Sequence, residues 1–288
     1  MWSCSLVLTF LMGGIDRDVV YSQPGGERLQ MDIYHPQTLS SEPKPAVLVI
    51  HGGAWVSGKR QDMATMCEAL AQEGFLAATV SYRLAPKHKW PTMVEDVRTA
   101  VRYLRSRAAE LKIDPNRLGA AGASAGGHLA LLLGASDSPT RDLAEYKGFS
   151  SQVQAVFNLF GPTDLGNDFP QSLDLMFAVV LGKPKNEATE IVKNASPVTH
   201  IGEKSAPVFT LHGKADPLVP VKQAERLDAA LKAKGVEHQM RLIDGMKHEV
   251  DMTNPAVTSA LTEALNWLKK KLASSVGAAQ VRTVSSRS

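Results

Sequence analysis

The sequence predicts an α/β fold in which a mostly parallel central sheet is covered by helices on both faces. Short apolar runs alternate with longer segments of helical periodicity along most of the 288 residues. Several short runs, such as 46–50 with the sequence AVLVI, are apolar at every position, as strands buried on both faces are. Because strands that alternate with helices form parallel sheets through right-handed crossovers, we expect residues 15–273 to form one such domain.

Each element is assigned from its periodicity and its boundary residues. The expected strands, which are short and rich in apolar residues, are 19–21, 29–34, 46–50, 75–80, 117–121, 153–159, 207–211 and 238–243. The first two flank the turn Pro24-Gly25-Gly26, which predicts a hairpin. The expected helices, which carry apolar residues at helical spacing, are 63–73, 93–111, 126–133, 221–233 and 258–272. Gly74 and Pro91 stand at helix boundaries, where these residue types are common.

Composition and charge exclude several classes of protein. With 44% apolar and 21% charged residues, the chain has the composition of a globular protein. The net charge of +3 is small, and the basic run Lys269–Lys271 closes an expected helix, where it compensates the helix dipole, so we expect no nucleic-acid partner. No apolar run approaches the ~20 residues that span a membrane. Cys4 and Cys67 are too few for a disulfide framework or a metal cluster, and no cofactor is indicated.

The two ends of the chain and one internal segment are expected to differ from the rest. Residues 1–14 contain a short apolar run without a preceding basic residue, and we interpret them as a signal remnant or a disordered end, which leaves the cellular location open. The polar tail 274–288 is expected to be flexible. Residues 161–205 lie between two expected strands and are interpreted as a small lid insert. The oligomeric state is left open.

Loops at the carboxyl ends of parallel strands carry function in such sheets. Four of these expected loops contain clusters of Gly, Ser, Asp and His: HGGAW at 51–55, GASAGG at 122–127, HGKADP at 212–217 and DGMKH at 244–248. One serine, one acid and one histidine, namely Ser124, Asp216 and His248, therefore follow strands whose ends are expected to converge. A serine hydroxyl becomes a nucleophile when an imidazole takes its proton, and a carboxylate fixes the tautomer of that imidazole. The pattern predicts a catalytic triad.

The GASAGG segment indicates how Ser124 is displayed. In a G-x-S-x-G turn between a strand and a helix, small residues at 122 and 126 let the neighbouring backbone pass close to the serine. Ala125 then supplies a backbone N–H group at the N-terminus of a helix. Gly53 and Ala54 of the HGGAW loop offer further N–H groups to a developing negative charge. We therefore expect Gly53, Ala54 and Ala125 to form an oxyanion hole.

These motifs together resemble those of the hormone-sensitive-lipase-like esterases, a group of α/β-hydrolases, and in particular its bacterial acetyl-xylan and feruloyl esterase-like branch. The shared segments, in family order over about 200 positions, are HGGAW at 51–55, SYRLAP at 81–86, GASAGG at 122–127, HGKADPLVP at 212–220 and His248. The resemblance implies the α/β-hydrolase fold, with Ser124 as nucleophile, Asp216 as acid and His248 as base. Ala54 departs from the third glycine of many relatives, and Ala123 stands where many have an acidic residue. Both departures put substrate preference in doubt.

Alternatives remain open. Asp164 follows another expected strand and is a rival for the acid. His51 and His128 belong to the same motifs, but we interpret them as residues that brace loops through hydrogen bonds. An amide-cleaving serine hydrolase, such as an aryl formamidase or a peptidase, uses the same machinery. A nucleotide-binding α/β protein is a remote alternative, because GASAGG does not have the spacing of a phosphate-binding loop.

The prediction of substrate size depends on the lid insert. Apolar residues recur there at helical spacing: Phe169, Leu173, Met176, Phe177 and Val180, with Asp174 facing away. Either this face packs on the sheet as core, or part of it faces Ser124. In the second case Leu173, Met176 and Phe177, together with Trp55, wall a small acyl pocket. The expected activity is that of a serine carboxylesterase for short-chain acyl esters, including acetyl or aromatic acyl esters of small molecules and carbohydrates.

Overall fold

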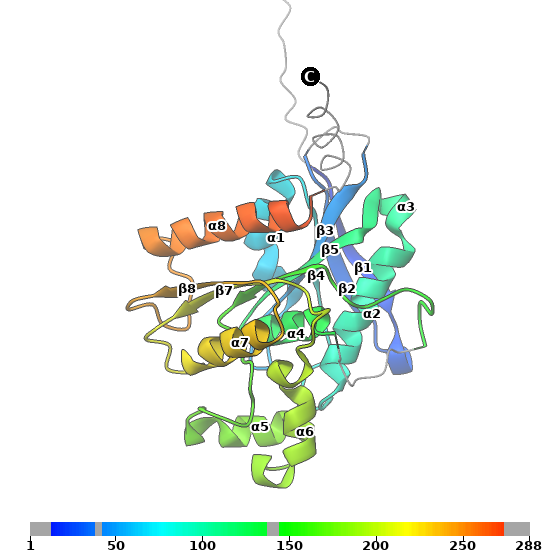
Figure 1. The fold of residues 1–288 in the computed structure, drawn as a ribbon. Helices are drawn as coiled ribbons and strands as arrows, with labels where there is room; N and C mark the ends of the chain where they lie inside the picture. Colours follow the sequence, from blue (N-terminus) through cyan, green and yellow to red (C-terminus); the bar gives the residue numbers. More distant parts are fainter. Residues whose placement is uncertain (1–12, 38–41, 137–143, 274–288) are drawn as a thin grey trace, which may run out of the picture.

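Eight strands form one sheet in the computed structural model, which describes residues 13–37, 42–136 and 144–273 (Figure 1). The strands are β1 (Ile15–Ser22), β2 (Leu29–Tyr34), β3 (Lys44–Ile50), β4 (Leu76–Val80), β5 (Ile113–Ala123), β6 (Ala155–Leu159), β7 (Val208–Gly213) and β8 (His238–Ile243). Their order in the sheet is β1-β2-β4-β3-β5-β6-β7-β8. The hairpin β1–β2 and the pair β2–β4 are antiparallel, and all other neighbours are parallel. The predicted mostly parallel sheet and its opening hairpin are confirmed.

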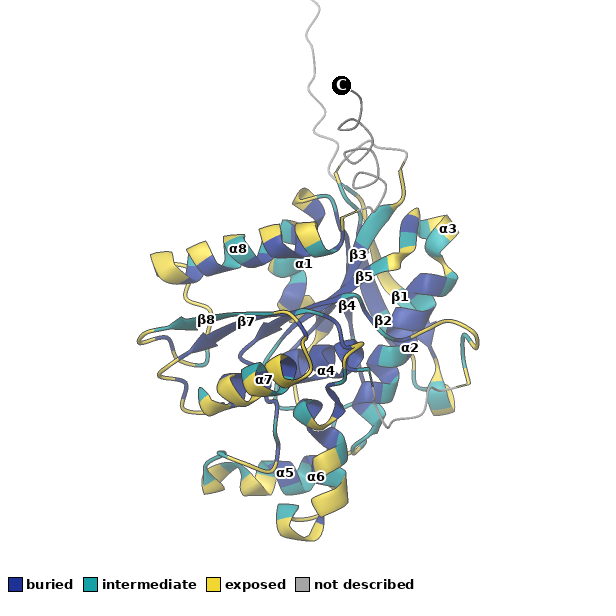
Figure 2. Ribbon diagram, in the orientation of Figure 1, coloured by how far each residue is buried: buried dark blue, intermediate teal, exposed yellow. Residues whose placement is uncertain are grey.

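Helices cover both faces of this sheet, as predicted. The main ones are α1 (Ala64–Gln72), α2 (Thr92–Ser106), α4 (Ala125–Gly134), α7 (Lys222–Ala233) and α8 (Pro255–Lys271). Figure 1 shows α1 and α8 on one face and α2, α4 and α7 on the other. Each face has its own apolar core, and the central strands β3, β4, β5 and β6, together with α4 on one face, are largely buried, whereas the edge strands β1 and β8 are more exposed (Figure 2). Burial on both faces accounts for the continuous apolar runs in β3 and β4.

Some boundaries differ from the sequence prediction for reasons that the structure makes visible. Helix α8 begins at Pro255, three residues before the predicted start, because the Asn254 side chain caps it by accepting a hydrogen bond from the Ala256 N–H group at 2.9 Å. Strand β5 begins at Ile113, which pairs with Lys44 across an irregularity in the ladder. Neither effect changes the apolar periodicity on which the prediction depended.

The prediction of a single helix over residues 93–111 is wrong. Helix α2 ends at Ser106, and a separate short helix α3 (Ala108–Leu111) follows after Arg107. The Ser106 hydroxyl donates a hydrogen bond to the Tyr103 carbonyl at 2.8 Å, and the Arg107 N–H group binds the same carbonyl at 3.1 Å. A serine hydroxyl that binds a carbonyl of the preceding turn competes with the backbone hydrogen bonds of the helix. It therefore favours a helix end at this position.

The expected lid insert lies between β6 and β7. It consists of α5 (Asp174–Leu181) and α6 (Thr189–Ala195), with short 3-10 turns at Gln171–Leu173, Lys185–Glu187 and Pro197–His200. Helices α5 and α6 project at the bottom of the view in Figure 1. The buried side chain of Gln223 in α7 fixes the start of the insert. Its oxygen accepts hydrogen bonds from the N–H groups of Thr163 and Asp164, both at 2.8 Å, so the insert has a defined attachment to the main body.

The expectations for residues 1–12 and 274–288 lie outside the described residues. In the parts of the chain that are described, no helix has the length and apolar character needed to cross a membrane. Nor do those parts contain a group of three or more His, Cys, Asp and Glu side chains arranged to hold a metal ion.

Candidate active site

Ser124 lies at a sharp turn between β5 and α4. Its backbone angles, φ 56° and ψ −121°, are strained for a residue with a side chain. The turn is tight because Gly122 and Gly126 leave no room for a Cβ atom: one built on Gly122 would lie 2.4 Å from the Gly126 carbonyl carbon, and one built on Gly126 would lie 2.0 Å from the Ile50 carbonyl oxygen. Neighbouring backbone therefore fills the space beside these glycines, and they do not form an open cradle for a phosphate.

The structure brings Ser124, His248 and Asp216 together from three loops. The Ser124 Oγ atom lies 2.8 Å from His248 Nε2, and His248 Nδ1 lies 2.6 Å from Asp216 Oδ2. Since a carboxylate accepts hydrogen bonds, Nδ1 carries the ring proton, and Nε2 is left to accept the proton of the serine hydroxyl. This arrangement can deprotonate Ser124 as it attacks a carbonyl carbon.

The carboxylate of Asp216 is held by its own loop. Its Oδ1 atom accepts hydrogen bonds from the N–H groups of Leu218 and Val219, both at 2.9 Å. Burial raises the pKa of Asp216, but the hydrogen bonds from His248 and from these two N–H groups outweigh burial and hold the pKa below its usual value. The carboxylate is therefore charged at neutral pH and faces the imidazole with its second oxygen.

Two residues beside the triad were not assigned a role from the sequence. His212 is buried, and its Nε2 atom donates to the Val219 carbonyl at 2.8 Å, which closes the loop around Asp216. The ring of Phe160 packs against the ring of His248, with centroids 4.6 Å apart. His212 lies in the HGKADP motif, which was a usable signal, whereas a single Phe after a strand gave none.

The rival acid, Asp164, has other partners. Its Oδ1 atom accepts from the Gly166 N–H group at 3.1 Å, its Oδ2 atom accepts from the Asn167 amide at 2.9 Å, and Arg226 lies 3.6 Å away. These contacts place Asp164 in the attachment of the lid insert to α7, whereas the hydrogen bond to His248 comes from Asp216.

The HGGAW loop approaches Ser124 with an unusual backbone. Three consecutive residues, Gly53, Ala54 and Trp55, have positive φ values of 104°, 52° and 61°. Within the described part of the chain, the N–H groups of Gly53, Ala54 and Ala125 donate to no protein acceptor. Unpaired N–H groups next to a nucleophile can bind an anion, and α4 adds the positive end of its dipole at Ala125.

Tyr82 of the SYRLAP segment supports this loop. Its hydroxyl donates to the His51 carbonyl at 3.0 Å, and the two rings stack with centroids 4.3 Å apart. His51 itself binds the Gly52 carbonyl through Nδ1 at 2.7 Å. The loop is therefore braced by hydrogen bonds and ring stacking, as interpreted for His51 from the sequence.

The four residues expected to wall an acyl pocket do not share one environment. Trp55 and Phe177 are buried, with 2% and 1% of their surfaces exposed, and their ring centroids lie 6.2 Å apart. Leu173 and Met176 are only partly buried against the same core. The apolar face of the insert thus packs largely as core. Asp174 is exposed and forms an ion pair at 3.4 Å with Lys185, whose ammonium group also lies over the Phe177 ring.

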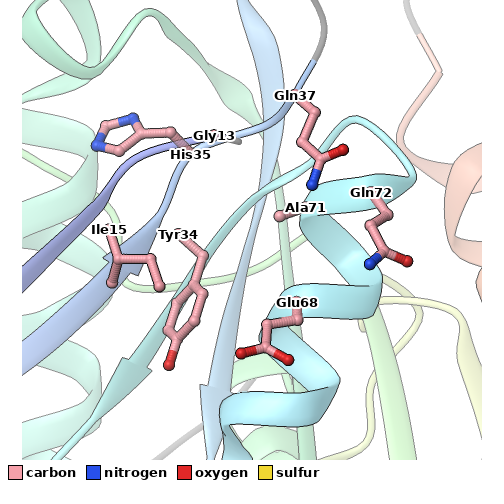
Figure 3. Close-up of a pocket in the computed structure, with 8 residues that line it drawn as sticks. All are labelled: Gly13, Ile15, Tyr34, His35, Gln37, Glu68, Ala71 and Gln72. Carbon is pink, nitrogen blue, oxygen red and sulfur yellow. The ribbon is translucent and has the colours of Figure 1, made fainter. Parts of the chain in front are cut away.

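A hollow of about 230 Å³ lies elsewhere, beside α1 and the β1–β2 hairpin (Figure 3). Tyr34, Glu68 and Gln72 are among its lining residues. Tyr34 pairs with Ala77 near the start of β4, whereas Ser124 follows the end of β5. Because β4 and β5 are both parallel to β3, the hollow and Ser124 lie at opposite ends of the sheet.

Comparison with known proteins places this arrangement in a family. The model of the family described as BD-FAE matches residues 31–231, a range that runs from β2 to α7 and includes Ser124 and Asp216. The chain belongs to the BD-FAE family. The resemblance to α/β-hydrolase esterases that the motifs indicated is confirmed at the level of family and fold.

Two relatives from Mycobacterium tuberculosis carry the names "Esterase LipC" and "Probable carboxylic ester hydrolase LipM". They are 30% and 31% identical to this BD-FAE chain over 249 and 215 residues, which cover 80% and 73% of it. The chain spans 61% and 50% of the lengths of these two relatives.

Solved structures show the same fold. A truncated form of a carbohydrate esterase from gut microbiota superposes with a TM-score of 0.80 at 26% identity, covering 92% of this chain and 99% of that one. Esterase 2 of Thermogutta terrifontis, phosphonylated by sarin, superposes with a TM-score of 0.79 at 26% identity, covering 91% of this chain and 95% of that one.

Proposed function

We propose that this BD-FAE chain is a serine carboxylesterase that hydrolyses short-chain acyl esters through an acyl-serine intermediate. The observation that carries the proposal is the hydrogen-bonded series from Ser124 through His248 to Asp216 at the N-terminus of α4. Ser124 is the nucleophile, His248 the general base and Asp216 the residue that orients and stabilises the imidazole. The esterase names of its relatives support the same reaction class.

In the first half of the reaction, the Ser124 oxygen attacks the ester carbonyl carbon while His248 Nε2 takes its proton. The carbonyl electron pair moves to the oxygen, which the N–H groups of Gly53, Ala54 and Ala125 stabilise. Each such donor contributes about 3 kcal/mol to lowering the barrier. The tetrahedral intermediate then collapses, the bond to the alcohol oxygen breaks, and the leaving oxygen takes the proton from Nε2.

In the second half, a water molecule takes the place of the alcohol. His248 Nε2 accepts one proton from this water as its oxygen attacks the acyl-serine carbonyl. Collapse of the second tetrahedral intermediate breaks the bond to the Ser124 oxygen, which regains the proton. The products are a carboxylic acid and an alcohol; the Ser124 and His248 side chains supply the nucleophile and the base, and backbone N–H groups supply the oxyanion donors.

The acyl group is expected to be small. Trp55 and Phe177 are almost completely buried, so we place them at the inner end of the acyl site. Leu173 and Met176, which are partly exposed, form the outer part of the acyl site. We propose residues 161–205 as the lid that covers this side, and acetyl or aromatic acyl esters, on small alcohols or carbohydrates, as the substrates.

Hydrolysis of nitrophenyl acetate by the wild type and by Ser124→Ala tests the proposal. We expect the substitution to lower kcat by at least about a thousandfold. Ser106→Ala is a matched control, because that hydroxyl only binds the Tyr103 carbonyl in α2, and it should retain the wild-type rate. Near-normal ester hydrolysis by Ser124→Ala would contradict the assignment, and faster cleavage of a matched amide than of the ester would make the protein an amide hydrolase.

The size of the acyl group is tested with nitrophenyl esters of graded length. We expect kcat/KM to be highest for acetyl to butyryl esters and unaffected by EDTA. A maximum at ten carbons or more, or strong activation at an oil–water interface, would identify a lipase and contradict the proposed acyl site.

A further inference from the structure

His128 joins three parts of the site that lie far apart in the sequence. It is fully buried in α4, one helical turn after Ser124, whose carbonyl accepts its backbone N–H group at 3.0 Å. Its Nδ1 atom accepts the indole N–H group of Trp55 at 3.2 Å, and its Nε2 atom donates to the Ala195 carbonyl at 2.7 Å. Trp55 belongs to the HGGAW loop at 51–55, which we call the oxyanion loop, and Ala195 ends α6 of the lid insert. One imidazole therefore connects the oxyanion loop, helix α4 and the lid insert.

These contacts determine the protonation of the ring. The indole N–H group can only donate and the carbonyl can only accept, so Nδ1 is bare and Nε2 carries the proton. Burial lowers the pKa of His128 to about 4, in agreement with a neutral ring. Both nitrogen atoms are satisfied, and such a pair of directed hydrogen bonds fixes the orientation of the partner more closely than apolar packing does.

The Trp55 ring that His128 holds is part of an aromatic group. It meets the ring of His128 edge-on at 5.0 Å and the ring of Phe177 at 6.2 Å, and Trp90 also packs on His128 at 5.8 Å. In the tetrahedral intermediate, the oxyanion faces the N–H groups of the oxyanion loop and the leaving oxygen faces His248. An acyl chain that occupies neither position can extend between the HGGAW loop and the lid insert, the two segments that carry Trp55 and Phe177.

We propose that His128 is a positioning residue that fixes Trp55 as the end wall of the acyl site and thereby limits the length of the acyl chain. The proposal rests on the esterase function proposed above. An indole N–H group without its acceptor is costly to keep buried, so the ring turns when the Nδ1 contact is lost. The turn opens space for additional carbons and also disturbs Ala54, which directly precedes Trp55.

Two substitutions separate the two contacts of His128. His128→Asn places an amide oxygen near the position of Nδ1, so it keeps an acceptor for Trp55 but does not reach Ala195. His128→Gln reaches Ala195 with its amide nitrogen but leaves the Trp55 N–H group unpaired. His238→Gln is a matched control, because His238 is a similarly buried histidine with two side-chain partners, Asp228 at 3.0 Å and Thr210 at 2.9 Å, in strand β8.

The readout is the ratio of kcat/KM for hexanoyl and acetyl nitrophenyl esters. We expect His128→Gln to raise this ratio about tenfold, because extra methylene groups in an apolar pocket change discrimination by about that factor or more. His128→Asn and His238→Gln should stay within about twofold of the wild type. A loss of stability alone would lower both rates and leave their ratio unchanged.

A second readout does not depend on activity. The indole N–H group of Trp55, assigned in NMR spectra by its absence in Trp55→Phe, should exchange slowly with solvent in the wild type and rapidly in His128→Gln. Should His128→Gln fail to fold, Trp55→Phe takes its place, since it keeps an aromatic ring but removes the donor and should raise the ratio in the same direction.

The outcomes separate the two proposals. The role of His128 would be overturned if every folded variant that lacks the Trp55–His128 hydrogen bond kept the wild-type ratio of kcat/KM for hexanoyl and acetyl esters. A wild type that hydrolyses no ester would overturn the proposed function. The exchange of the Trp55 N–H group with solvent would then test the role of His128 by itself, and rapid exchange in the wild type would contradict that role.

Discussion

Acidification should destabilise the protein through His128. Burial lowers the pKa of this imidazole to about 4, whereas an unfolded histidine has a pKa of 6.5. Between these values the unfolded chain binds a proton that the folded chain does not, so the free energy of unfolding falls as the pH drops. The contribution of a neutral ring is complete above about pH 6.5 and is lost by about pH 4. From the two pKa values, His128 alone lowers the free energy of unfolding by about 2 kcal/mol between about pH 7.5 and pH 5.

Urea unfolding of the wild type and of His128→Gln at several pH values measures this contribution. Burial also lowers the pKa of His51, His212 and His238, but these groups titrate in both proteins and cancel in the difference. We expect the wild type to be more stable at about pH 7.5 and its advantage to shrink by about 2 kcal/mol at about pH 5. A constant advantage over this range would refute a neutral, buried imidazole at His128.

Three further predictions test other parts of the site. Gly126→Ala places a Cβ atom 2.0 Å from a backbone oxygen of β3, and it should lower kcat/KM by about a hundredfold or more through displacement of the serine, while Gly14→Ala, with open space around its Cβ, should have no effect. Asp216→Asn should lower kcat by about 10⁴, and Asp164→Asn should mainly lower the melting temperature; the reverse order of kcat effects would show that Asp164 is the acid. Tyr82→Phe removes the 3.0 Å hydrogen bond that braces the oxyanion loop, and it should cost about 1 kcal/mol in urea unfolding and lower kcat more than it changes KM. Unchanged stability and kcat in Tyr82→Phe would show that ring stacking alone holds the loop.

Much of the fold and the convergence of the candidate site were accessible from the sequence because they follow from local patterns. Apolar runs such as that in β3 indicated buried strands, and parallel strands end at one edge of the sheet. Residues in the loops after β5, β7 and β8 must therefore come close together, as Ser124, Asp216 and His248 do. Glycines at 122 and 126 indicated the tight turn for the same local reason.

Other features depend on contacts between distant segments and left no such pattern. The end of α2 at Ser106 depends on one hydroxyl that binds the preceding turn. The packing of Phe160 against the His248 ring depends on where β6 lies relative to β8. Likewise, a helical apolar stripe around Phe177 is compatible with a pocket or with core, and only the nearly complete burial of Phe177 in the folded chain favours core.

The role of Ser124 as the nucleophile is tested most directly by labelling the protein with a fluorophosphonate and locating the adduct by mass spectrometry of peptides. We expect one adduct per chain, on Ser124, with loss of ester hydrolysis in proportion to labelling. We also expect His248→Ala to react far more slowly, because the hydroxyl 2.8 Å from Nε2 then lacks its base. An adduct on a different residue, or full esterase activity in protein whose Ser124 is completely labelled, would contradict the assignment of Ser124 as the nucleophile.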